Sequence, residues 1–234
     1  MISNTLDFAH FRQLLRHHSR VQIPDFLQAD AAEELHACLR DEVPWETAQR
    51  TDVEPGPGLM RSPPPGSPQD AALLQAVRER ALAGFEFYFD RYRMIDAHRD
   101  GLDPGLVLHV VVDFLNSPEF LTFARYITGD EAIHMVSAIG VRYRAGHFLR
   151  LHNDKQDDEQ RTHAYVINLN RDWLADWGGL LEFVDPSGKQ VLQSFTPHWN
   201  SLSLFKVPQL HQVTPVNPWA RTPRYSITGW FRRG

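Results

Sequence analysis

The sequence has one cysteine, no long apolar run and no block of basic residues. Cys38 cannot form an internal disulfide, and a single cysteine also excludes a cysteine-rich zinc site. No apolar stretch approaches the roughly 20 residues that a membrane span requires. The N-terminal stretch MISNTLDFAHFRQLLRHH lacks the apolar centre of a signal peptide. We therefore expect a cytoplasmic protein with no membrane partner.

Charge of neither sign is concentrated in the chain. The formal net charge is -5, with 23% charged and 42% hydrophobic residues, which is ordinary for a globular protein. This acidic balance argues against a nucleic-acid partner. A chain of 234 residues suits one large all-β or mixed domain, so we expect residues 1–234 to form a single domain. The sequence carries no signal for an oligomeric state.

Residues 1–130 are expected to be mostly helical and to support the rest of the chain. Apolar residues recur at helical spacing in DFAHFRQLLRHH, AAEELHACLRDE, residues 69–98 and residues 113–130. Asp30 is the expected cap of the second helix, and Ser117 and Gly129 are expected to begin and end the last. Between these helices, residues 53–68 are rich in proline and glycine. They predict a surface loop, with a lid or substrate-entry segment as the functional alternative.

From residue 132 the pattern changes to short β-rich runs separated by glycine, proline and aspartate turns. The clearest turn is Asp185-Pro186-Ser187-Gly188. Many short, evenly spaced strands favour a sandwich or barrel, including a double-sheet jelly roll. The predicted fold is therefore mainly β with flanking helices, with residues 132–234 as the core.

The stretch LHNDK places His152 and Asp154 two residues apart. Twelve histidines make such a spacing unremarkable alone, and a second copy occurs at His98-Arg99-Asp100. Residues i and i+2 share a face on a strand but point about 200° apart on a helix. Because residues 69–98 are expected to be helical, His98 and Asp100 are interpreted as a solvated helix end. If the run FLRLHND ends a strand, His152 and Asp154 share a face and can bind one metal ion.

A third ligand for such a metal is expected at His211, which begins the short run HQVTPV. Two histidines and one carboxylate on one side of an ion form the facial triad of non-haem Fe(II) oxygenases. Zinc remains chemically possible with the same ligands.

Oxygenases of this kind usually take electrons from 2-oxoglutarate, whose distal carboxylate requires a fixed cation. Arg224, at the start of RYSITGW, suits this role because a guanidinium binds a carboxylate through two parallel hydrogen bonds. Ser226 lies on the same strand face and can donate a third. Arg221 is a competitor, but it lies in the loop NPWARTP, where Pro223 interrupts any ladder.

Taken in order, these segments resemble the 2-oxoglutarate/Fe(II)-dependent dioxygenases, most closely their prolyl-4-hydroxylase-like branch. The resemblance covers about residues 110–232 and rests on FLNSPEFLTFARYITG, YRAGHFLRLHND, INLNRDW, GGLLEF, HQVTPV and RYSITGWF. It implies a double-stranded β-helix, a cupin-like jelly roll with helices on one sheet. It also implies Fe(II), 2-oxoglutarate and O2 as cofactor and co-substrates, with ascorbate as a supporting reductant.

The resemblance also implies roles for individual residues. His152, Asp154 and His211 would bind iron, Arg224 would bind 2-oxoglutarate, and Tyr143 would reach the same co-substrate. Asn168 stands where some relatives have a second tyrosine that contacts it, so its role stays open.

The reaction that the resemblance implies is hydroxylation of a C–H bond, best matched by a prolyl residue in a protein or peptide. A free amino acid or small metabolite is the alternative substrate, and a non-catalytic metal-binding jelly roll that acts as a sensor or interaction module is the alternative from another class.

His147, His163 and His198 are expected at the surface, and Trp230 and Phe231 are expected to serve packing. Gly178 and Gly179 are expected to serve backbone geometry.

Overall fold

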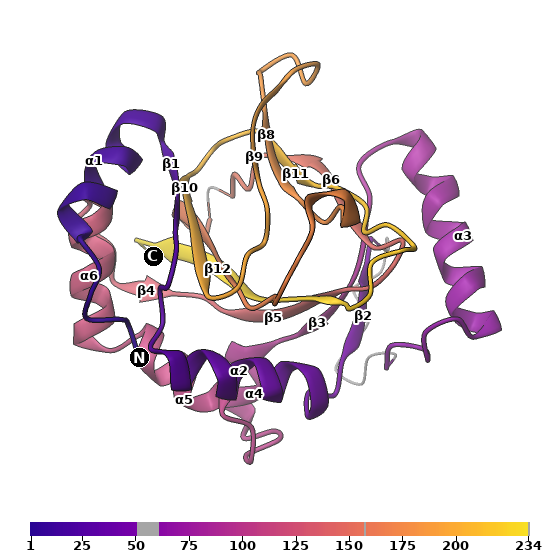
Figure 1. Ribbon diagram of the computed structural model, residues 1–234, viewed down its shortest axis with the longest axis horizontal. Helices are drawn as coiled ribbons and strands as arrows, with labels where there is room; N and C mark the ends of the chain where they lie inside the picture. Colours follow the sequence, from indigo (N-terminus) through magenta and orange to yellow (C-terminus); the bar gives the residue numbers. More distant parts are fainter. Residues whose placement is uncertain (51–60, 157, 234) are drawn as a thin grey trace.

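The computed structural model describes residues 1–50, 61–156 and 158–233. It consists of a curled antiparallel sheet with helices on one side of it and at both ends (Figure 1). The helices are α1 (Phe8–His18), α2 (Ala29–Asp41), α3 (Pro68–Ala83), α4 (Met94–Asp100), α5 (Leu108–Leu115), α6 (Pro118–Thr128) and the 3-10 turn η1 (Ala175–Trp177). The strands are β1 (Arg20–Ile23), β2 (Glu46–Gln49), β3 (Phe87–Tyr92), β4 (Met135–Val136), β5 (Ile139–Tyr143), β6 (Phe148–His152), β7 (Arg161–Asn168), β8 (Leu181–Val184), β9 (Val191–Phe195), β10 (Ser201–Lys206), β11 (His211–Val213) and β12 (Arg224–Arg232).

The strands form two facing walls that are joined through β3. One wall runs β1-β10-β7-β12-β5-β3, and the other runs β6-β11-β8-β9. β3 pairs with β5 through Asp90–Tyr92 and with β6 through Phe87 and Tyr88, so the sheet turns a corner there. The resulting near-barrel, visible end-on in Figure 1, confirms the predicted jelly-roll core with flanking helices.

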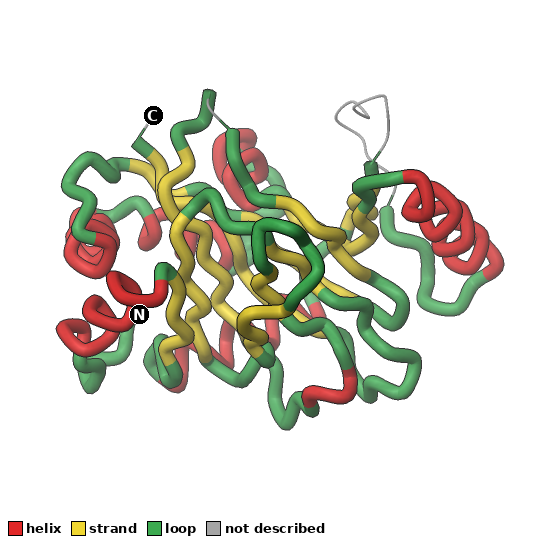
Figure 2. The backbone as a smooth tube through the Cα atoms, turned by 90° about the horizontal axis from the view of Figure 1, so that it is seen from above, coloured by secondary structure: helices red, strands yellow, loops and turns green. Residues whose placement is uncertain are grey.

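Helices α2, α4 and α5 cover the outer face of the larger wall, whereas α3 stands apart at one end (Figures 1 and 2). The apolar side of α2, including Leu35 and Leu39, packs in one cluster with Ile227 and Phe231 of β12. α3 has only Val77 buried among its residues. The helical layer therefore supports β12, the strand that carries Arg224, from behind.

The ends of the predicted helices agree with the structure in most places. The Ser117 hydroxyl accepts a hydrogen bond from the backbone N–H of Phe120, and Gly129 ends α6 in the left-handed conformation. Asp30 is not the cap of α2, which begins one residue earlier after Gln28. Asp30 instead lies in the first turn, where its negative charge still favours the positive end of the helix dipole.

The prediction of a helix across residues 69–98 is wrong in its middle part. α3 ends at Ala83 before Gly84, and residues 87–92 form β3 at the corner of the sheet. The sequence FYFDRY is aromatic-rich and suits a strand, and pairing with two strands that come more than 45 residues later stabilises it there. With β1 and β2, β3 makes the first 130 residues part of the sheet as well as its helical support.

Two further expectations concern the proline- and glycine-rich loop and membrane-spanning segments. Residues 53–60 of the predicted loop lie outside the described residues, so the lid interpretation stays a prediction. Within the part that is described, no helix combines the length and the apolarity that crossing a bilayer would require.

Candidate metal and co-substrate site

His152, Asp154 and His211 converge at one end of the near-barrel. Each offers a ligand atom, and these atoms lie within 4.8 Å of one another. His152 is the last residue of β6 and His211 the first of β11, and the two are directly paired across the strands. Among the described residues this is the one group of three or more histidine, cysteine or acidic side chains close enough to hold a metal ion.

Asp154 reaches this group through a turn rather than through strand alternation. β6 ends at His152, and Asp154 has a φ of 60°, in the left-handed region that aspartate tolerates better than most residues. The Asn153 side chain accepts a hydrogen bond from the backbone N–H of Lys155, which closes the turn. The i, i+2 spacing therefore identified two side chains that lie together, but the turn after β6, and not strand alternation, directs the Asp154 carboxylate toward the two histidines.

Hydrogen bonds from the protein backbone orient both imidazole rings. Nδ1 of His152 lies 2.9 Å from the Arg150 carbonyl oxygen, and Nδ1 of His211 lies 2.8 Å from that of Gln209. A carbonyl only accepts hydrogen bonds, so each Nδ1 carries the proton and each Nε2 presents a free lone pair. Metal-binding histidines commonly use this arrangement to set the ring orientation.

The donor atoms are spaced as ligands of a single ion would be. Nε2 of His152 lies 3.2 Å from one oxygen of Asp154, and Nε2 of His211 lies 3.4 Å from the other. Two ligands at right angles and about 2.1 Å from a metal are separated by roughly 3 Å. The side chains present therefore fit a divalent metal bound on one face, and iron in particular suits two histidines and a carboxylate.

The electrostatic setting favours the protonation states that metal binding requires. Burial, reinforced by the nearby His152, lowers the pKa of His211 to about 4, so its imidazole is neutral at pH 7. Burial alone would raise the pKa of Asp154, but the neighbouring His152 and His211 side chains hold it below its ordinary value. His211 and Asp154 thus have the protonation states that metal binding requires.

Arg224 is a buried cation without a full set of partners. Its side chain is 2% exposed, and within the described chain its Nε and Nη1 have no hydrogen-bond acceptor. Burial lowers its pKa to about 10, so the guanidinium stays charged at neutral pH. A buried, charged group with unused donors is costly unless a ligand supplies an acceptor. The unused donors of Arg224 therefore indicate a site for an anion, whose oxygens can accept such charge-assisted hydrogen bonds.

Asn168 contacts Arg224 and so acquires a structural explanation. Nη2 of Arg224 donates to the Asn168 side-chain oxygen at 3.3 Å. The amide nitrogen of Asn168 in turn lies 3.3–3.4 Å from the hydroxyls of Ser201 and Ser203 on β10. Asn168 thus restrains one side of the guanidinium and leaves the other side for a ligand.

The triad and Arg224 line the same cavity, which has a volume of about 110 Å³. Tyr143 and Ser226, the other predicted co-substrate residues, also line it and are buried. The Arg224 guanidinium lies 5.2 Å from the centre of the Tyr143 ring, and burial raises the pKa of the Tyr143 phenol, which stays neutral. A small acid in this cavity can therefore contact the metal at one end and Arg224 at the other.

Trp230 was expected to serve packing, but it also lines this cavity. Arg224, Ser226, Thr228 and Trp230 occupy alternate positions of β12 and all contribute to the cavity wall. This period of two was the signal that could have identified Trp230. Phe231, on the other face, is fully buried in the helix-covered core, as expected.

The other sequence-based assignments have mixed outcomes. His147 and His163 are buried, not at the surface, because His147 packs against Tyr88 of β3 and His163 is part of the central strand β7, whereas His198 is exposed. Arg221 is exposed and does not line the cavity. His98 contacts Asp113 at 2.9 Å and belongs to α4, away from the triad group.

The two glycines serve backbone geometry, as predicted. Gly178 and Gly179 both have positive φ angles, of 71° and 63°. A Cβ atom on Gly178 would lie 2.0 Å from the Pro215 carbonyl oxygen, so the backbones approach too closely for a side chain.

Comparison with known proteins agrees with this geometry. Residues 139–232 match the family model described as the 2OG-Fe(II) oxygenase superfamily. Prolyl 3-hydroxylase OGFOD1 from Mus musculus is 30% identical over 119 residues, which are 48% of this chain and 21% of that protein. The chain thus matches about a fifth of that relative's length.

Two solved structures share the fold at low sequence identity. An oxidoreductase of the 2OG-Fe(II) oxygenase family from Burkholderia pseudomallei has a TM-score of 0.65 and 16% identity, covering 100% of this chain and 94% of its own. A prolyl hydroxylase from Trichoplax adhaerens, solved with a peptide fragment of the hypoxia inducible factor oxygen degradation domain, has a TM-score of 0.62 and 16% identity. The match covers 99% of this chain and 94% of that one.

Proposed function

We propose that this chain is a member of the 2OG-Fe(II) oxygenase superfamily, whose family model matches residues 139–232, and that it hydroxylates a prolyl residue in a protein or peptide with 2-oxoglutarate as co-substrate. The observation that carries the co-substrate assignment is Arg224, because it lines the cavity of the metal ligands and its buried charge has unused donors. The prolyl substrate rests on the relatives named above. O2 would supply the oxidising power for cleavage of a C–H bond, with bound Fe(II) to activate it and 2-oxoglutarate as the second electron donor beside the substrate.

The protein's own residues bind and orient the reacting groups. His152, Asp154 and His211 would hold the iron with their rings already oriented by backbone carbonyls. Arg224 would bind the distal carboxylate of 2-oxoglutarate through donors that the protein leaves unused, while Asn168 keeps the guanidinium in place. Because these side chains are already oriented, the binding of iron and 2-oxoglutarate costs less conformational entropy.

Tyr143 and Ser226 are proposed to add hydrogen bonds to the same carboxylate. Both line the cavity with Arg224, and the neutral phenol of Tyr143 can donate a hydrogen bond to a carboxylate oxygen. The remaining wall includes Val166, Leu181 and Phe205. These apolar side chains exclude water from the reacting groups, which protects the substrate site from side reactions.

The decisive experiment is an assay of the purified chain with Fe(II), ascorbate and 2-oxoglutarate. Proline-containing peptides should increase succinate release, and mass spectrometry should find one added oxygen on the peptide. Omission of ascorbate should shorten the active period if it keeps the iron reduced. An Asp154→Ala variant is the matched control and should show neither product.

The same assay separates the alternative functions. If free proline or another small metabolite is hydroxylated and no peptide is, the peptide substrate is wrong and the hydroxylase class holds. If 2-oxoglutarate neither binds nor turns over, the co-substrate assignment is wrong, and a metal-binding sensor becomes the better explanation. A cytoplasmic location is part of the proposal, and fractionation of cells that express the chain would test it.

A further inference from the structure

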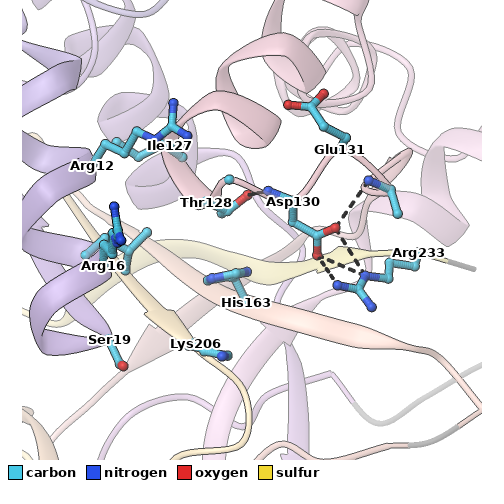
Figure 3. A pocket seen from close by; sticks show the side chains of 13 residues that line it. Arg12, Arg16, Ser19, Ile127, Thr128, Asp130, Glu131, His163, Lys206 and Arg233 are labelled. Carbon is cyan, nitrogen blue, oxygen red and sulfur yellow. Dashed lines mark hydrogen bonds and ion pairs between the residues drawn. The ribbon is translucent and has the colours of Figure 1, made fainter.

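A second cavity, of about 810 Å³, lies on the outside of the sheet, where α1 and the end of α6 meet β7 and β10 (Figure 3). None of its lining residues belongs to the cavity of the metal ligands. β7 separates the two, because Ala164 lines the inner cavity and the adjacent His163 lines the outer one. The outer cavity is therefore a separate site that the proposed reaction does not use.

Positive charge exceeds negative charge in this outer cavity, although the whole chain has a formal net charge of -5. Four cationic side chains line it, namely Arg12, Arg16, Lys206 and Arg233, against the two carboxylates of Asp130 and Glu131. The cations come from α1, from the end of β10 and from the segment after β12. Several distant segments thus bring like charges together, and although water screens the repulsion between these exposed side chains, together they attract an anion.

Two of these cations have no partner that the structure accounts for. Arg233 is neutralised by Asp130, with contacts of 2.8–3.2 Å, and Arg12 lies 4.8 Å from the centre of the Tyr126 ring. In the described part of the chain, neither the Arg16 guanidinium nor the Lys206 ammonium forms a hydrogen bond or an ion pair, and no dashed line reaches either in Figure 3. Both are free to bind an anion.

His163 adds a buried hydrogen-bond acceptor to the same cavity. The residue is 7% exposed and lines the cavity, and burial lowers its pKa to about 4, so the imidazole is neutral. The Thr162 hydroxyl donates its hydrogen bond to the Phe231 carbonyl oxygen. Toward His163 Nδ1, 3.2 Å away, the hydroxyl oxygen is therefore the acceptor and Nδ1–H the donor. Nε2 is then an unprotonated acceptor, and it has no partner among the residues that the structure describes.

This combination selects the kind of anion. A phosphate group has a second pKa near 6, so close to neutral pH part of it carries both negative charge and an O–H donor. Sulfate and carboxylate groups carry no such proton at that pH. Of these three groups, only the phosphate can offer charged oxygens to two cations and an O–H donor to a hydrogen-bond acceptor. The volume exceeds that of a single phosphate and falls in the range of small-molecule sites, and Leu15 and Ile127 provide an apolar wall.

We propose that this outer cavity binds a small molecule that carries a phosphate group. Arg16 and Lys206 bind its charged oxygens, and His163 Nε2 accepts a hydrogen bond from its protonated oxygen. The proposal is independent of the oxygenase reaction, because it uses none of the metal-binding or co-substrate residues.

The test is a calorimetric titration of the full chain at pH 6.5 and constant ionic strength, with inorganic phosphate, glycerol phosphate and sulfate. Phosphate and glycerol phosphate should bind saturably, and sulfate should bind at least about tenfold more weakly because it offers no donor to His163. Equal binding of sulfate and phosphate, or heats that never saturate, would overturn the proposal.

Variants locate the binding. Arg16→Ala and Lys206→Ala should each weaken phosphate binding by about five- to tenfold, whereas Lys189→Ala removes an equal charge from an exposed turn and should have no effect. His163→Phe keeps a ring but removes the acceptor, so phosphate should lose its advantage over sulfate. Unchanged affinity in all three cavity variants would refute the site.

One further variant excludes the inner cavity, whose cation could also attract phosphate. Arg224→Gln should bind phosphate as the unaltered chain does. Loss of phosphate binding in that variant would place the anion beside the metal ligands and overturn the proposal.

Discussion

Replacement of Arg224 by alanine should weaken 2-oxoglutarate binding far more than replacement of Arg221. Arg224 is 2% exposed, lines the cavity of the metal ligands and has no hydrogen-bond partner in the described chain for its Nε and Nη1 donors. In the variant, the distal carboxylate of the co-substrate would lie in a buried cavity without its cation. Truncation of one member of a buried, hydrogen-bonded charge pair costs about 2–5 kcal/mol. At about 1.4 kcal/mol per factor of ten, the dissociation constant should rise roughly thirty- to several-thousand-fold.

Arg221→Ala is the matched control because it removes the same charge three residues away. The Arg221 side chain is exposed and does not line the cavity. Exposed charges contribute about 0–1 kcal/mol, so the dissociation constant should change by less than about fivefold. Mn(II) binding should survive in both variants because neither change touches His152, Asp154 or His211.

The measurement is anaerobic calorimetry of 2-oxoglutarate binding to each variant with Mn(II) in place of iron. If Arg224→Ala binds within threefold of the unaltered chain, the cavity does not hold the co-substrate as argued. If Arg221→Ala is the damaging change, the loop and not β12 carries the anchor. Loss of Mn(II) binding in Arg224→Ala would show instead that the change disturbed the metal site.

Four other outcomes are expected. Asp154→Ala should weaken Mn(II) binding at least about a hundredfold without unfolding the chain, as equilibrium dialysis and circular dichroism can establish, and retained binding would contradict the ligand assignment. Asn168→Ala removes the hydrogen bond to Arg224 and should raise the 2-oxoglutarate dissociation constant about two- to tenfold; no change would mean that the contact does not position the guanidinium. Burial lowers the pKa of His147 to about 4 from an ordinary 6.5, so as the pH falls His147 takes up a proton in the unfolded chain before it does so in the folded chain. Between pH 6.5 and 4 this residue should therefore lower the free energy of unfolding of the metal-free chain by up to ~3 kcal/mol. Urea titrations of His147→Phe over this pH range should show a smaller loss. Gly178→Ala should lower the free energy of unfolding by about 2–5 kcal/mol through its positive φ and the close Pro215 carbonyl, and a neutral result in urea would argue against that approach.

The sequence by itself determined the features that depend on local chemistry or on order along the chain. Ser117 and Gly129 marked the ends of α6 because capping involves only neighbouring residues. The spacing of His152 and Asp154 was unremarkable alone, but with the later His211 and the run that begins at Arg224 it formed a recognisable order along the chain. The change near residue 132 from helical spacing to short β-rich runs separated by turns indicated the β core.

The tertiary structure decided what depends on distant partners. Residues 87–92 form β3 because strands β5 and β6 pair with them, and their own sequence was also compatible with continuation of the preceding helix. His147 and His163 are buried by segments remote in sequence, so no local pattern could assign their protonation states. Asn168 acquired a role only when β7 and β12 lay side by side and its amide met Arg224. The physical reason is common to all three: pairing, burial and charge compensation are properties of neighbours in space, and the order of residues along the chain specifies them only through the complete fold.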